Sequence, residues 1–207
     1  MNIRSGFILF IIVLFVAFSA APKPAAADDV QISSGELEYI EDWIELYQGV
    51  EIDWQEYETA SQWGEIDQAD SIIYLYEDVE LYFAEGEIYS QELSIYMDED
   101  ELIFEEDVLL DYKQEDGNEM EMTSSRMVYY TEEGEFEMTE PLEIEQENRE
   151  IAAGSGNYDE EDEVFHFADG VEIVEDGDTI TSNEATLLLE EDEVFTAEGD
   201  VEIELDL

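Results

Sequence analysis

The stretch 161–173, EDEVFHFADGVEI, is repeated almost letter for letter at 191–203, EDEVFTAEGDVEI. Both copies are rich in carboxylates, and both end in Val-Glu-Ile. The same short signature, with Leu at some positions, occurs six times at spacings of 29, 29, 34, 29 and 30 residues. A period of this length indicates a repeat architecture. The apolar pairs of the six signatures are Val50 and Ile52, Val79 and Leu81, Val108 and Leu110, Leu142 and Ile144, Val171 and Ile173, and Val201 and Ile203.

Apolar residues alternate with polar ones around each signature, a period of two that is typical of half-buried strands. The residue before each signature favours turns, so the sequence predicts a turn there and three or four short strands in each copy. The long spacing is explained by an insertion at Asp116-Gly117, a dipeptide that favours hairpins. The six turn formers are Gly49, Asp78, Asp107, Pro141, Gly170 and Asp200.

No helical period is sustained beyond the first residues of the chain. The pattern therefore predicts an elongated all-β, β-solenoid-like body of about six ~29-residue repeats, with roughly 16–20 strands at usual strand lengths.

The N-terminus has the layout of a secretory signal peptide. Arg4 precedes an apolar run from Phe7 to Ala21, which is followed by Pro22 and small residues that end at Ala27. We expect residues 1–27 to be cleaved after Ala27, leaving one domain at 28–207 and an exported protein. The alternative is an uncleaved membrane anchor, although the run is shorter than the ~20 residues that usually span a bilayer.

The composition is strongly acidic, with 61 Asp and Glu against 5 Lys and Arg in the whole chain. Outside residues 1–27 the only cations are Lys113, Arg126 and Arg149. Nucleic-acid binding is excluded, because it needs a basic footprint. The carboxylates are spread over all six copies, which favours adaptation to concentrated salt, where screening removes the repulsion between like charges, over a patch for one basic partner.

Enzyme chemistry finds little support, and we expect no catalytic residues and no cofactor. The chain has no Cys, and its single histidine, His166, is expected on the outward face of a strand. Calcium is the strongest alternative because of runs such as YDEEDE, but neither EF-hand nor β-roll spacing is present. We therefore predict no specific metal site.

The order of turns, V-x-I, I-x-S/A and aromatic strands resembles the OstA-like/LptA/LptC group of lipopolysaccharide-export proteins. The resemblance covers residues 33–207 and is clearest from Ile151 onward. It implies a periplasmic protein with an open β-jellyroll, whose apolar groove holds the acyl chains of lipid A. It also implies partners among other β-jellyroll Lpt components, joined by edge-strand pairing, or a head-to-tail homo-oligomer.

If the resemblance holds, the groove is lined by the twelve apolar residues of the six signatures. The predicted function is a lipopolysaccharide carrier or bridge in a salt-adapted diderm bacterium. Two alternatives remain open: an LptC-like component that keeps its membrane anchor, and a ligand-free structural β-solenoid in which the apolar stripes only pack on each other.

Overall fold

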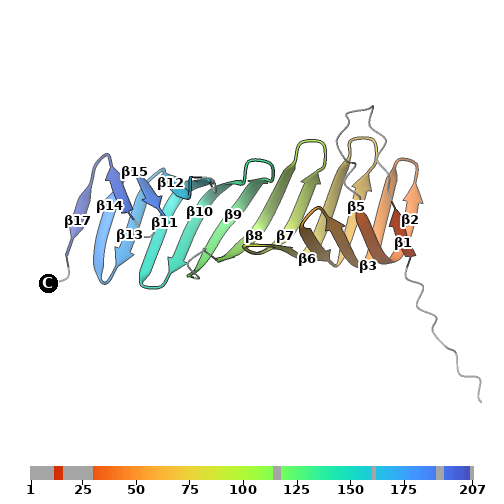
Figure 1. Ribbon diagram of the computed structural model, residues 1–207, viewed down its shortest axis with the longest axis horizontal. Coiled ribbons are helices and arrows are strands. Elements are labelled where there is room, and N and C mark those ends of the chain that lie inside the picture. Colours follow the sequence, from red (N-terminus) through yellow and green to blue (C-terminus); the bar gives the residue numbers. More distant parts are fainter. Residues whose placement is uncertain (1–11, 16–29, 114–117, 160–161, 190–193, 206–207) are drawn as a thin grey trace, which may run out of the picture.

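The computed structural model describes residues 12–15, 30–113, 118–159, 162–189 and 194–205. These residues form a sheet of 17 strands, paired antiparallel throughout, and include no helix. The predicted all-β class is therefore confirmed. Figure 1 shows an elongated body in which successive hairpins follow one another along the long axis.

The strands differ greatly in length. They are β1 (Ile12–Phe15), β2 (Gln31–Ile40), β3 (Trp43–Trp54), β4 (Tyr57–Ser61), β5 (Trp63–Asp67), β6 (Ile72–Phe83), β7 (Gly86–Tyr96), β8 (Glu101–Lys113), β9 (Glu119–Tyr130), β10 (Glu135–Gln146), β11 (Arg149–Asp159), β12 (Val164–Ala168), β13 (Val171–Glu175), β14 (Asp178–Ser182), β15 (Glu184–Leu188), β16 (Val194–Glu198) and β17 (Glu202–Glu204).

The turn predicted before each signature is wrong for four of the six copies. Gly49, Asp78, Asp107 and Pro141 lie inside the long strands β3, β6, β8 and β10. At Gly170 and Asp200 the strand is interrupted, but the chain runs on without reversing into a hairpin. These positions are corners within a strand, so the middle copies contain fewer and longer strands than predicted.

Each corner is a β-bulge. Between β8 and β9, Glu105 pairs with Arg126 and Val108 pairs with Ser124, so two residues of β8 face a single residue of β9. The two bulge residues, Glu106 and Asp107, have left-handed φ values of 62° and 55°. A bulge bends its strand sharply. Because the bulges of successive strands lie side by side, they bend the whole sheet along one line.

Serine hydroxyls satisfy backbone carbonyls beside these corners. On the facing strands β2, β4, β7, β9 and β14, a serine opposite the bulge donates to the carbonyl two residues further on, at 2.9–3.2 Å. On β11, Ala153 and Gly154 face the bulge of β10 instead. The serine of the I-x-S/A motif therefore has a structural role, because a buried hydroxyl needs a hydrogen-bond partner. The serines are Ser34, Ser61, Ser90, Ser124 and Ser182.

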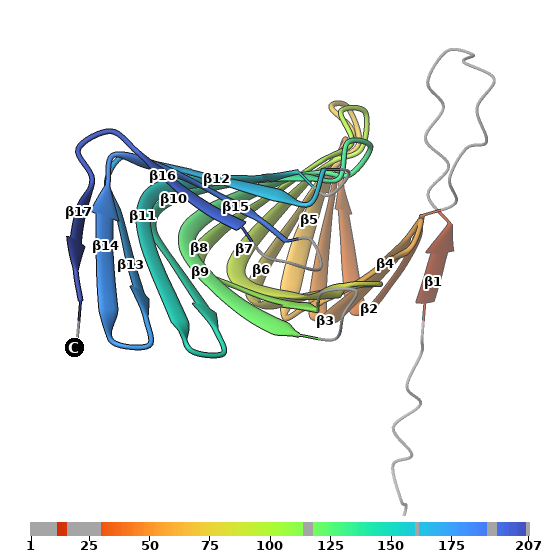
Figure 2. The ribbon, with the colours of Figure 1, turned by 60° about the vertical axis from the view of Figure 1, so that its left-hand side comes forward.

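The bend divides the sheet into two half-sheets that face each other (Figure 2). The upper half-sheet contains β5, β12, β15 and β16, with the parts of the long strands that pair alongside them. The lower half-sheet contains β4, β13, β14 and β17, with the remaining parts. We call the line of bulges the corner line. The hairpins at the far end of each half-sheet from this line are the upper lip and the lower lip.

The hairpin predicted around the insertion is present, since β8 and β9 pair from Lys113 and Glu119 inward. The Asp116-Gly117 dipeptide itself lies outside the described residues. So does most of the predicted signal peptide, of which only Ile12–Phe15 is described, as strand β1 on the edge of β2. Among the described residues, none forms a helix with the length and apolarity that a membrane crossing requires.

Candidate functional site: an apolar interior with an aromatic mouth

The structure brings ten of the twelve predicted groove residues together between the half-sheets. All ten, from Val50 to Ile173, are at most 2% exposed. The last two, Val201 and Ile203, are 42% and 61% exposed at the C-terminal end of the same inner face. The ten residues form the inner face of the lower half-sheet and are covered by the upper one.

The inner face of the upper half-sheet supplies the other wall, which the sequence analysis did not assign. Its members come from segments outside the six signatures, such as SIIYLY at 71–76 and RMVYY at 126–130. Alternation within those segments was the signal that could have found them. Their side chains are almost fully buried, and they include Ile73, Leu75, Leu93, Phe104, Met127, Phe136, Met138 and Phe165.

Four buried methionines contribute to this interior. Met120 and Met122 belong to the lower half-sheet, and Met127 and Met138 to the upper one. Methionine is unbranched and adapts its shape to irregular apolar partners. An interior that contains four of them tolerates repacking better than one built from branched side chains alone.

Two tyrosine pairs connect the lips across the mouth. Tyr57 of the lower lip meets Tyr129 of the upper lip edge to face, with ring centroids 6.0 Å apart and hydroxyl oxygens 3.2 Å apart. Tyr112 and Tyr158 repeat the arrangement, with centroids at 5.7 Å and hydroxyls at 3.3 Å. All four side chains are buried. Each pair therefore joins an upper strand to a lower strand that is distant in sequence.

Phe83 completes this connection from the lower lip. Its ring lies 6.2 Å from that of Tyr129 and 6.3 Å from that of Phe136. Tyr129 and Phe136 stack on each other at 4.2 Å within the upper lip. We call Tyr57, Phe83, Tyr112, Tyr129, Phe136 and Tyr158 the aromatic seam. It closes the mouth along the middle of the molecule.

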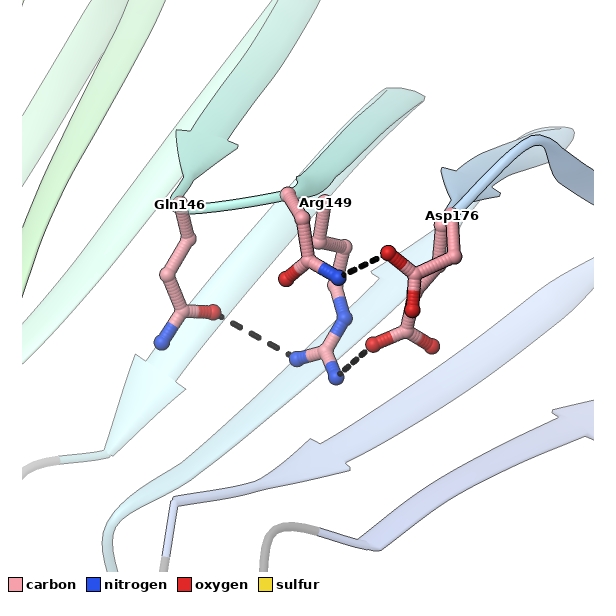
Figure 3. A network of polar contacts seen from close by, with 5 residues as sticks. Gln146, Arg149 and Asp176 are labelled. Atoms are coloured by element: carbon pink, nitrogen blue, oxygen red, sulfur yellow. Dashed lines mark hydrogen bonds and ion pairs between the residues drawn. The ribbon is translucent and has the colours of Figure 1, made fainter.

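A network of polar side chains joins two hairpins of the lower lip (Figure 3). Arg149 donates to Glu175 at 2.8 Å and to Gln146 at 3.4 Å, and the Arg149 side chain is only 12% exposed. Asn148 donates to Asp176 at 2.6 Å. This network ties the β10–β11 hairpin to the β13–β14 hairpin.

A hollow of about 750 Å³ opens at the lower lip beside this network. Two of the three cations outside residues 1–27, Lys113 and Arg149, line it together with Phe83, Tyr112 and Met120. Carboxylates outnumber them, so a free phosphate would meet net repulsion. The carboxylates are Glu85, Glu87, Asp111, Glu119, Glu121, Glu145, Glu147 and Glu150.

The outer face of the lower half-sheet carries carboxylates in direct register. Five consecutive strands, β7 to β11, place Glu87, Asp111, Glu121, Glu145 and Glu150 in one row. Neighbouring strands are about 4.8 Å apart, and like charges directly opposite each other destabilise a sheet. We call these five residues the carboxylate row.

Several outward tyrosines donate hydrogen bonds to carboxylates two residues earlier on the same strand. Tyr47 donates to Glu45 at 2.5 Å, and this hydrogen bond is the main reason that the pKa of Tyr47 is raised to about 12. Tyr82 donates to Glu80 at 2.7 Å, and its pKa is raised for the same first reason.

His166 points outward, as predicted, and its Nδ1 lies 3.3 Å from the Thr186 hydroxyl. Among the described residues, no group of three or more His, Cys, Asp or Glu side chains is arranged to hold a metal ion.

These features define a class of protein: an antiparallel sheet folded on itself around an apolar interior. Residues 108–204 match the family described as lipopolysaccharide-assembly, LptC-related. That match confirms the resemblance to the Lpt group that the sequence predicted. A comparison with curated proteins finds no match.

Among solved structures, the chain is similar to LptH from Pseudomonas aeruginosa, described as the LptA-homologous periplasmic component of the conserved lipopolysaccharide transport device. The two share 12% identity with a TM-score of 0.48, over 51% of this chain and 76% of that chain.

Proposed function

We propose that this protein is a non-enzymatic carrier of lipopolysaccharide in the periplasm, and that it shields lipid A acyl chains between its two half-sheets. The observation that carries the proposal is the continuous apolar inner face that runs through the repeats. The family match over residues 108–204 supports the same class of ligand. On this proposal, the twelve signature residues contact acyl chains from the lower half-sheet.

The exposed apolar residues support a bridging role. Tyr39 and Ile40 are 60% and 47% exposed at the N-terminal end, and Ile203 and Leu205 are 61% and 56% exposed at the C-terminal end. Exposed apolar surface with unpaired strand edges favours pairing with another β-sheet. We propose that these ends continue the interior into a neighbouring Lpt component or a second copy of this chain.

A second candidate, the ligand-free scaffold, is favoured by one observation. The ten buried signature residues already pack against the upper half-sheet, so the interior is a complete core without a lipid. In this case the aromatic seam would be permanent, and no lipid would copurify with the protein.

A lipopolysaccharide derivative with a benzophenone in one acyl chain distinguishes the two candidates. Benzophenone inserts into methionine C–H bonds readily, so illumination should label Met122 or Met138, which point inward. Outward residues of the same strands, Thr123 and Glu137, serve as internal controls. Labelling confined to outward residues, or none at all, would contradict the carrier and support the scaffold.

The fate of residues 1–27 separates an LptA-like carrier from an LptC-like anchored component. We propose cleavage after Ala27, and N-terminal sequencing of the exported protein tests it. An intact N-terminus recovered from membranes would instead support the anchored component. The proposed adaptation to salt is tested separately, through the carboxylate row.

A further inference from the structure

We infer that the acyl chains enter sideways, through a mouth that opens when the aromatic seam parts, rather than by threading in from either end of the sheet. This inference rests on the proposed carrier function. It concerns the route into the interior, which that function leaves open.

The first argument is that the mouth is closed in the structure. The seam joins the lips at three places: Tyr57 to Tyr129, Phe83 to Tyr129 and Phe136, and Tyr112 to Tyr158. The inward side chains behind it are almost fully buried. An acyl chain therefore reaches the signature residues from the side only after the seam parts.

The second argument concerns the polar head of the ligand. Threading from an end would draw the phosphorylated sugars past the inward wall of Leu81, Leu110 and Ile144, which offers them no hydrogen bonds. Burying charged groups without partners is strongly unfavourable. Sideways loading leaves the sugars in water at the lips while only the chains move inward.

The third argument is that the seam is built from groups that tolerate opening. Its two tyrosine pairs meet through neutral hydroxyls at 3.2 Å and 3.3 Å. Water can replace such a hydrogen bond at small net cost, and tyrosine tolerates a boundary between apolar and wet surroundings. Phe104, which is fully buried deeper in the interior, has no polar group to offer.

The corner line supplies the hinge. Pairs of left-handed residues, such as Glu77 with Asp78 and Glu106 with Asp107, face one residue on the neighbouring strand. Small backbone rotations at these bulges swing the two half-sheets apart without breaking the ladders within either one. Without lipid, opening exposes apolar surface, so the closed state prevails.

The test ties the lips together in a background without cysteine. Tyr57→Cys/Tyr129→Cys is bridged with a short bis-methanethiosulfonate, which a reductant removes. The matched control, Trp54→Cys/Tyr57→Cys, bridges neighbours within the lower lip, whose native rings are 5.6 Å apart. Loading is followed as transfer of fluorescent lipopolysaccharide from detergent micelles.

We expect the cross-lip bridge to slow loading by about tenfold or more, because it blocks the conformational step, and reductant to restore it. The bridge within one lip should leave the rate unchanged. If the cross-lip protein loads as fast as the control, lipid enters by the ends, and the inference is overturned while the carrier function stands. If the wild-type and reduced proteins take up no lipid, the carrier function itself fails.

A second variant keeps the test independent of cysteine chemistry. Tyr112→Phe/Tyr158→Phe preserves both rings and removes the hydroxyl contact at 3.3 Å. A weaker seam should load faster, by at least roughly two- to tenfold, which is the factor for a single lost hydrogen bond. An unchanged rate, in a protein whose circular dichroism matches the wild type, would overturn the seam as the barrier.

Discussion

Left-handed backbone at the corners is carried largely by residues other than glycine. Glu77 and Glu106 have φ values of 62°, and Asp78 and Asp107 have values of 52° and 55°. The left-handed conformation costs an ordinary residue roughly 1–2 kcal/mol. The acidic residues at these corners therefore lower the free energy of unfolding, because each holds a left-handed backbone conformation.

Glu106→Gly should relieve this strain. We expect a change in the free energy of unfolding between about zero and 1 kcal/mol in the stabilising direction, because glycine's backbone entropy offsets part of the gain. Glu143→Gly is the control, since it removes one exposed carboxylate from an ordinary strand position and should destabilise by about 0.5–1 kcal/mol. Denaturant unfolding in molar salt measures both. If Glu106→Gly and Glu143→Gly lower the free energy of unfolding equally, the corner is not strained.

The raised pKa of Tyr47 makes a second residue-scale prediction. Its hydrogen bond to Glu45 holds the folded-state pKa at about 12, above the ordinary value of 10.0. The stabilising effect is complete below pH 10 and is lost as the pH rises through about 12, because the unfolded chain releases this proton first. Ultraviolet titration of tyrosinate should show Glu45→Gln lowering the pKa of Tyr47 toward the ordinary value. If the pKa of Tyr47 is the same in Glu45→Gln as in the wild type, the hydrogen bond to Glu45 is not the cause of the raised pKa.

The sequence could identify the corner residues but not their role. Gly49, Asp78 and Pro141 were recognised as turn formers because glycine and aspartate tolerate positive φ and proline restricts the backbone. A bulge and a reversing turn use similar residues. Whether the chain reverses depends on pairing with neighbouring strands, which no local pattern reports.

At the scale of elements, the carboxylate row places five negative charges in register across neighbouring strands. The Debye length is about 30 Å at 0.01 M salt and 3 Å at 1 M. Repulsion between charges about 4.8 Å apart is therefore felt at low salt and largely screened at high salt. The row gives the salt hypothesis a specific structural basis.

Glu121→Gln, in the middle of the row, should stabilise the protein at low salt. Relief of two cross-strand repulsions is expected to add roughly 0.4–2 kcal/mol to the free energy of unfolding near 0.01 M salt, and much less at 1 M. Glu132→Gln in the exposed β9–β10 turn removes the same charge outside the row. Thermal unfolding at both salt concentrations gives the comparison. A gain that is equal for both variants would assign the effect to net charge alone.

Alternation within strands also predicted which residues point inward, and ten signature residues are buried as that pattern requires. The seam was not predictable in the same way. Tyr57 and Tyr129 are 72 positions apart, and they meet only because the half-sheets fold over each other. Local periodicity assigns a face to each residue, but it does not say which residues of the opposite half-sheet they contact.

At the scale of the whole molecule, the two ends of the sheet differ from its middle. Within the described residues, β17 pairs on one side with β14, and its inward residue Ile203 is 61% exposed. At the other end β1 covers part of β2. In a chain cleaved after Ala27, β1 is removed and β2 becomes the outer strand.

The cleaved protein should therefore join head to tail through β2 and β17. Such a contact pairs two different edges and does not close, so it extends into a chain or reaches a β-structured partner. Ser33 of β2 and Glu202 of β17 lie in one row of the lower half-sheet, at its two ends. Single variants Ser33→Cys and Glu202→Cys, mixed under mild oxidation, should form disulfide heterodimers in preference to homodimers, and more so as concentration rises. High salt should favour the pairing, because it screens two strongly acidic bodies.

Glu133→Cys, in the exposed β9–β10 turn, is the matched control, because β9 lies within the sheet and pairs with β8 and β10 on its two sides. It should form few mixed dimers with either end variant. Equal dimer yields for all three variants would show that the disulfides form by random collision and not through a specific contact between the ends. A strictly monomeric protein at high concentration and high salt, with no cross-link to any envelope partner in cells, would contradict the bridge. The exposed Tyr39 and Ile203 would then be ends of an isolated sheet, which is the arrangement that the ligand-free scaffold requires.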